Sequence, residues 1–119
     1  MRARRATTKI PPPLETAVQK QIKDYLGIRG WFVSNIRERY SKSGGQFSDP
    51  GIPDLICIKR GRVVMLEVKR PDSSYSKPND RQLAWHAEWQ RQDGEVYVVR
   101  SVEEAMEACD KEAKDEVFF

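Results

Sequence analysis

Residues 51–70 read GIPDLICIKRGRVVMLEVKR and contain two apolar runs separated by a turn-forming glycine, Gly61. This pattern predicts two short strands joined by a tight turn. Side chains two positions apart on a strand point to the same face, so Glu67 and Lys69 share a face. If the strands pair as a hairpin around Gly61, Asp54 returns beside them. The stretch therefore predicts that two carboxylates and an ammonium group converge at one edge of a sheet.

These three charged groups suit the hydrolysis of a phosphate ester. Two carboxylates are hard oxygen ligands of the kind that Mg²⁺ and Mn²⁺ prefer. A bound metal ion polarises a phosphate and lowers the pKa of its water, and a neighbouring lysine can orient that water or neutralise charge on the phosphate. The alternative is a salt bridge from Lys69 to Glu67 or Asp54 on an ordinary amphipathic hairpin. The spacing alone does not separate the two interpretations.

The order of residues around these charges resembles a known family. Pro53-Asp54 followed by Glu67-Val68-Lys69 resembles the PD-(D/E)xK nuclease signature. The wider context is more specific and resembles the VRR-NUC family, the virus-type replication-repair nuclease domain, which also stands alone in many phages. The similarity extends over about residues 14–108. The positions that carry it are Gly51-Ile52-Pro53-Asp54-Leu55, Gly61-Arg62, Leu66-Glu67-Val68-Lys69, Gln82, Gly94, Val96, Val98-Val99-Arg100-Ser101 and Glu103-Glu104-Ala105.

The resemblance implies a metal-dependent endonuclease that acts on DNA. In this family pattern Asp54, Glu67 and the backbone carbonyl of Val68 hold Mg²⁺ or Mn²⁺, and Lys69 positions or activates the attacking water. The implied fold is an α/β arrangement with a mixed, mostly four-stranded sheet flanked by helices in the order α-β-β-β-α-β-α. The alternative is a non-catalytic nucleic-acid-binding module on the same scaffold. Retention of both acids and the lysine favours the enzyme.

Two further residues enter through the resemblance. Glu15 matches a glutamate on the first helix that reaches the metal site, although an acid in a first helical turn also interacts favourably with the helix dipole. Gln82 matches a glutamine that orients the water or a phosphate near Lys69. The family places this glutamine closer behind the loop's proline than Pro78 stands here, and the alternative for Gln82 is a solvent-exposed polar side chain.

The rest of the chain indicates one intracellular domain. At 119 residues and 33% charged residues it is globular, with a basic, proline-containing arm at 1–13 and a single domain at 14–119. Two cysteines provide no disulfide framework, and Cys57 is expected as a small core residue. No apolar run approaches a membrane span. A phage protein acting in a bacterial cytoplasm fits these features through the resemblance.

The charge distribution suits a polyanionic partner. The net charge is +3, and the acids gather in residues 103–119, away from the proposed site. A mixed, solvated surface is the alternative. The resemblance implies branched or junction DNA, with duplex, flap and nicked DNA also compatible, and a homodimer would place two sites on two strands. The basic side chains expected to contact DNA are Arg37, Arg39, Lys42, Arg70, Lys77 and Arg81.

Periodicity and capping signals predict the remaining elements. Asn79 or Asp80 is expected to cap the helix that carries Trp85 and Trp89, a pair expected in the core or at an interface. His86, the single histidine, is expected on the surface of that helix, with a role as an acid or base as the alternative. The predicted ranges are helices at 14–29, 80–92 and 101–114, strands at 30–36 and 95–100, and a long polar loop at 37–50.

Overall fold

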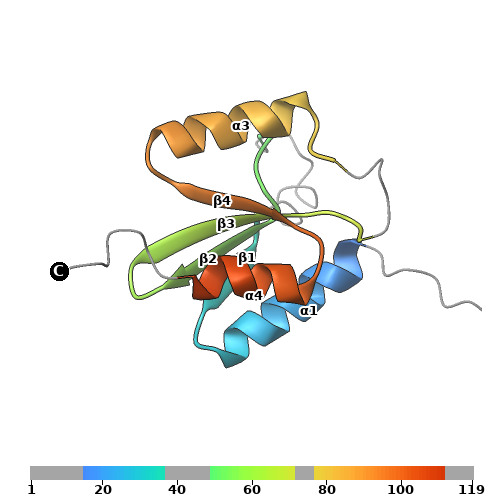
Figure 1. Cartoon of the computed structure of the whole chain (residues 1–119), viewed down its shortest axis with the longest axis vertical. Coiled ribbons are helices and arrows are strands. Elements are labelled where there is room, and N and C mark those ends of the chain that lie inside the picture. The colour runs from blue at the N-terminus through green and yellow to red at the C-terminus, as the bar shows by residue number, and fades with distance from the viewer. Residues whose placement is uncertain (1–14, 37–48, 72–76, 112–119) are drawn as a thin grey trace, which may run out of the picture.

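In the computed structural model, residues 15–36, 49–71 and 77–111 are described, and they form a four-stranded sheet with helices on both faces (Figure 1). This arrangement and its order confirm the α/β fold expected from the sequence. Among the described residues, no helix has both the length and the apolar character needed to cross a bilayer. The elements are α1 (Glu15–Ile28), β1 (Phe32–Asn35), β2 (Leu55–Lys59), β3 (Arg62–Val68), α3 (Asp80–Arg91), β4 (Glu95–Val99) and α4 (Val102–Asp110).

The sheet is mixed, with strands in the order β1-β2-β3-β4. The first three strands are antiparallel neighbours, whereas β4 returns parallel to β3 after the α3 crossover. In the β2–β3 hairpin Leu55 pairs with Leu66. One step further along the same register, Asp54 is level with Glu67, so the two acids lie at the same end of the sheet and on the same face.

A two-residue turn closes this hairpin. Arg60 and Gly61 both have positive φ angles, 52° and 85°. Two consecutive positive φ angles characterise the type I′ turn, whose twist matches that of the flanking strands. Glycine adopts such an angle without a steric penalty. The turn therefore sets the register that brings Asp54 back to Glu67.

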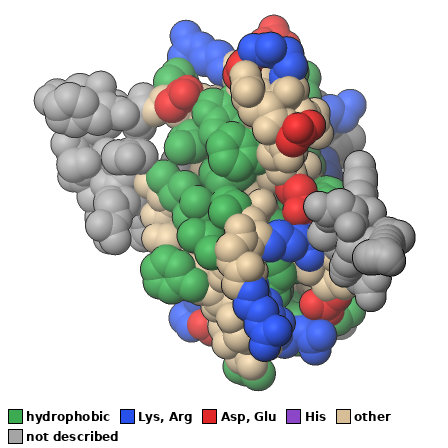
Figure 2. Space-filling model, turned by 90° about the vertical axis from the view of Figure 1, so that its left-hand side faces the viewer, with side chains coloured by type: hydrophobic (Ala, Val, Ile, Leu, Met, Phe, Trp, Pro, Cys, Tyr) green, Lys and Arg blue, Asp and Glu red, His purple; other side chains and the backbone are tan. Residues whose placement is uncertain are grey.

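One face of the sheet forms the hydrophobic core. Helices α1 and α4 lie together against this face, and α3 covers part of the other (Figure 1). Alternate residues of β3, Val64, Leu66 and Val68, point into the core, where Trp31 is also buried and Cys57 is buried as expected. Elsewhere apolar side chains reach the surface, and Figure 2 shows them gathered on one side of the molecule. Phe32, for example, is 68% exposed.

A single arginine ends α4 earlier than the sequence indicates. The helix was expected to run to 114, but it ends at Asp110 and Lys111 has extended backbone. Arg62 Nη1 donates hydrogen bonds to the carbonyl oxygens of Cys109 and Lys111, while Arg62 Nε and Nη2 form a bidentate pair with Glu95. The guanidinium thus satisfies the terminal carbonyls that the helix leaves open. Hydrogen bonds from Arg62 hold the pKa of the Glu95 carboxyl below its usual range.

We expect Arg62→Met to destabilise the fold by about 1–3 kcal/mol near pH 7, because it leaves a half-buried carboxylate and several carbonyls without their donor. The lowered pKa of Glu95 contributes stability above its unfolded value, which is lost as the pH falls through the folded pKa. Urea denaturation from about pH 7 to pH 3 should therefore show a smaller difference between wild type and variant at low pH. Arg60→Met, an exposed position in the same turn, should change little; equal losses in both variants would contradict this account.

Candidate active site

Two acids are buried at the end of the β2–β3 hairpin. Asp54 is 4% exposed and Glu67 is fully buried. The Val68 backbone N–H donates a hydrogen bond of 2.8 Å to Asp54 Oδ2, and the Ile36 N–H donates to the Asp54 carbonyl oxygen. Backbone groups of both neighbouring strands therefore hold Asp54 in place. The hairpin thus places Asp54 beside the end of β3, as the sequence predicts.

Glu67 shares its Oε2 atom with two side chains. Gln82 Nε2 donates a hydrogen bond of 2.8 Å to this oxygen, and Lys69 Nζ lies 3.4 Å from it. Lys69 Nζ also donates to Gln82 Oε1 at 3.2 Å. The amide of Gln82 thus bridges the carboxylate and the ammonium group. These contacts include the ion pair between Lys69 and Glu67 that the salt-bridge interpretation expects. They also include the buried amide of Gln82, which an ordinary amphipathic hairpin does not require.

The helix cap holds Gln82 in this position. Asn79 is the N-cap of α3 and accepts a hydrogen bond from the Gln82 backbone N–H, while Gln82 Oε1 accepts from the Asn79 N–H. This reciprocal capping box fixes the side chain at the start of the helix. Gln82 is 2% exposed, so the solvent-exposed alternative is wrong. Despite the unusual spacing behind Pro78, the cap directs the amide toward Glu67.

His86 belongs to the same cluster, and its expected surface position is wrong. It lies one helical turn after Gln82, is 7% exposed, and places Nε2 3.8 Å from Glu67 Oε1. Burial, and then the nearby charge of Lys69, lower the pKa of His86 below its ordinary value. The imidazole is therefore neutral at physiological pH. Its i, i+4 spacing from Gln82 is the sequence signal that would have indicated burial.

The segment before Asp54 rests directly on α3. The Gly51 N–H donates to Asp49 Oδ1, forming a short turn. A Cβ atom at Gly51 would lie 2.3 Å from the Arg81 carbonyl oxygen, closer than two non-bonded atoms approach. Only a residue without a side chain fits this contact. The position of Asp54 therefore depends on the first turn of α3, the same turn that presents Gln82.

The carboxylates at this end of the sheet can be compared with the ligands that a divalent metal ion requires. Among residues 15–36, 49–71 and 77–111, no three His, Cys, Asp or Glu side chains form a cluster that could hold a metal ion. A site with Glu15 as a third protein carboxylate is therefore not assembled in this conformation. The pair Asp54 and Glu67 is nevertheless sufficient for Mg²⁺, which usually binds one or two carboxylates and keeps several waters. Two carboxylates at one sheet end fit such an ion.

The remaining predicted residues lie around this end of the sheet. Glu15 begins α1, and Figure 1 shows the first turns of α1 and α3 on the side of the sheet where β3 ends. Lys77 and Arg81 are exposed near the start of α3, and Arg70 is partly exposed after β3. Three further predicted DNA contacts fall outside the described residues, namely Arg37, Arg39 and Lys42.

Comparison with known proteins identifies one clear relative in structure. A solved structure described as a VRR_NUC domain matches the chain with a TM-score of 0.62 and 28% sequence identity. The match covers 81% of this chain and 94% of that one. No family model and no curated protein matches the chain. The structural match includes nearly the whole of its counterpart, so the likeness concerns a complete domain.

We expect His86→Gln to remove a pH-dependent loss of stability. A histidine with a lowered folded pKa binds its proton more readily in the unfolded chain, so stability falls as the pH drops below the unfolded value of about 6.5. His86 is the only histidine, so the difference between wild type and variant in urea denaturation from about pH 7.5 to pH 5.5 in EDTA reports on it. A wild-type curve as flat as that of the variant would contradict the burial argument.

Gly51→Ala should destabilise the fold by about 1–3 kcal/mol, because the added methyl group overlaps the α3 backbone. Gly27→Ala is the matched control, since a Cβ atom there meets nothing within 4 Å. Alanine is also favoured over glycine in a helix by up to about 1 kcal/mol. Thermal unfolding of both variants provides the comparison. Equal stability of the two would mean that the 49–54 segment does not rest on α3 in solution.

Proposed function

The chain carries a VRR-NUC domain, and we propose that it is a metal-dependent nuclease that hydrolyses phosphodiester bonds in DNA. The observation that carries this proposal is the triangle of Glu67, Lys69 and Gln82 at the sheet end where Asp54 returns. Burial of a carboxylate is costly unless its charge is compensated. A fold that buries two acids beside a lysine retains them for chemistry more readily than for stability.

The acidic residues supply the proposed ion site. Asp54, Glu67 and the backbone carbonyl of Val68 would hold Mg²⁺ or Mn²⁺. Such an ion, when bound, polarises a phosphate and lowers the pKa of its water. The hydrogen bond from the Val68 N–H orients Asp54, and Gln82 orients Glu67. Both carboxylates are thus held before any ligand arrives, which reduces the reorganisation that binding requires.

Lys69 acts on the attacking water and on the phosphate. Its ammonium group is held near Glu67 by two acceptors, Glu67 Oε2 and Gln82 Oε1. From this position it orients the water, or offsets negative charge that develops on the phosphate in the transition state. Gln82 contacts both groups and holds the amine of Lys69 beside the carboxylate of Glu67. Glu15, which begins α1 at the same end of the sheet, is proposed to tune the site from that helix.

The surroundings support a nucleic-acid substrate. The exposed cations Lys77 and Arg81 and the partly exposed Arg70 lie near the start of α3 and the end of β3 and are proposed to bind backbone phosphates. Binding through phosphates weakens steeply with salt. We further propose selectivity for branched or junction DNA, and a homodimer that presents two sites to two strands.

We expect Lys69→Ala to lower the rate of DNA cleavage at least about 100-fold in Mg²⁺ or Mn²⁺, because the variant lacks the group that acts on the water. Labelled duplex, flap and four-way-junction DNA are incubated with each protein, and EDTA should abolish cutting. The matched control is Lys20→Ala, which removes an exposed lysine whose ion pair with Asp24 contributes little.

Two outcomes would overturn the proposal. Equal residual cutting by wild type and Lys69→Ala would place the activity elsewhere. Binding without cutting in either metal ion would favour the non-catalytic module. Circular dichroism of Lys69→Ala separates loss of chemistry from loss of fold, and an unfolded variant would indicate that the Lys69–Glu67 pair serves stability.

A further inference from the structure

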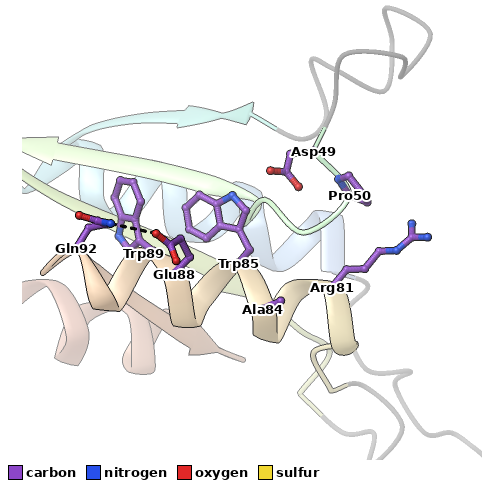
Figure 3. Close-up of a pocket in the computed structure, with 8 residues that line it drawn as sticks. All are labelled: Asp49, Pro50, Arg81, Ala84, Trp85, Glu88, Trp89 and Gln92. Atoms are coloured by element: carbon purple, nitrogen blue, oxygen red, sulfur yellow. Dashed lines mark hydrogen bonds between the residues drawn. The ribbon is translucent and has the colours of Figure 1, made fainter.

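A second feature of α3 lies beside the acidic cluster. A hollow of about 620 Å³ opens between this helix and the Asp49-Pro50 segment (Figure 3). Trp85 and Trp89 line it, and both rings project from the same face of the helix (Figure 3). Neither tryptophan belongs to the hydrophobic core on the opposite face of the sheet. The function proposed above gives this aromatic hollow no role.

The two rings form a rigid stack. Their centroids are 5.0 Å apart and their planes differ by 22°. Trp89 Nε1 donates a hydrogen bond to the Glu95 carbonyl oxygen, and the ring lies so close to Gly94 that a Cβ atom there would overlap it. Trp89 is thereby fixed, and it supports Trp85 from one side. A preformed aromatic surface loses little conformational freedom when a flat ligand stacks on it.

The charges around the hollow favour a neutral ring over a phosphate. The carboxylates of Asp49 and Glu88 line it, and hydrogen bonds from Arg91 and Gln92 hold the pKa of Glu88 below its usual range. Carboxylate oxygens accept hydrogen bonds from the amino groups of nucleobases but offer no donor to a phosphate. Arg81 extends outward at the end of the hollow nearer the start of α3 (Figure 3). A base inside and a phosphate near Arg81 match this distribution of charge.

The hollow and the acidic cluster share their supporting elements. A Cβ atom built on Gly51 would lie 3.0 Å from Trp85 Cβ, and Gly51 is three residues before Asp54. On the helix, Trp85 is followed directly by His86, which approaches Glu67 at 3.8 Å. The two sites therefore share helix α3 and the segment that leads to Asp54. A nucleotide next to a phosphate at Glu67 would thus be directed toward the helix that carries Trp85.

We infer that this hollow binds an unpaired nucleobase next to the cleaved phosphate, by stacking on Trp85. The inference rests on the nuclease function proposed above and names the feature of DNA that the site recognises. A base inside a duplex is stacked on its neighbours and cannot enter, whereas a nucleotide at a flap or branch point is free to do so. The hollow thus selects DNA that carries an unpaired nucleotide beside a duplex.

The test measures binding in EDTA, so it does not depend on cleavage. Flap DNA carries the fluorescent base 2-aminopurine at successive positions from the branch point, and one position should be quenched by the wild-type protein. Trp85→Ala should lose this quenching and bind flap DNA roughly 10- to 100-fold more weakly, as expected for the loss of one stacked base. Its affinity for perfect duplex should not change.

Three controls keep the test decisive. Leu83→Ala removes an exposed residue of the same helix that does not line the hollow, and it should behave as wild type. Trp85→Phe keeps an aromatic face and should restore most of the affinity, which a purely structural role would not require. An abasic nucleotide at the quenched position should weaken wild-type binding as Trp85→Ala does, without adding to that substitution.

The outcomes separate this inference from the nuclease proposal. Flap binding that depends on Trp85 without any cleavage would support the hollow and contradict the nuclease. Cleavage that depends on Lys69 but is equal in wild type and Trp85→Ala, with no quenched position, would overturn the inference and leave the nuclease intact. If Trp85→Ala does not fold, the abasic substrate and Trp85→Phe decide the question with folded proteins.

Discussion

The fully buried carboxylate of Glu67 is the constraint on which the site depends. A charge removed from water is tolerated only where other groups compensate it, and here the compensation comes from several directions. Lys69 approaches from the same strand, and the Gln82 amide from the helix that crosses over it. Helix α3 is thus tied to the sheet by polar contacts at its first turn. The position of α3 therefore determines whether the buried charge of Glu67 is compensated.

Side chains that alternate along β3 and its continuation serve two different parts of the structure. Leu66 and Val68 point into the core beneath α1 and α4, whereas Glu67 and Lys69 point toward α3. A shift of one residue in register would exchange these sets and bury the charges in the core. Stability and the proposed chemistry therefore use opposite faces of one strand. The tight turn at Gly61 protects both by holding the register.

The aromatic hollow lies along α3, the helix that also carries residues of the acidic cluster. Gln82 and His86 face the acidic cluster, while Trp85 and Trp89 face the Asp49-Pro50 segment. One short helix thus presents polar groups to one neighbour and aromatic rings to another. Because Gly51 packs against the same helix, the segment that carries Asp54 and the hollow have α3 as a common support.

Local patterns in the chain were enough to predict the order of the elements, the hairpin, a helix cap at Asn79 or Asp80, and the placing of Asp54, Glu67 and Lys69 at one end of the sheet. These features depend on side-chain periodicity and on turns of a few residues, which neighbouring amino acids encode. The burial of His86, the early end of α4 beside Arg62 and the exact reach of Gln82 could not be read in the same way. Each depends on contacts between residues far apart in the chain, and only packing of the helices on the sheet creates those contacts.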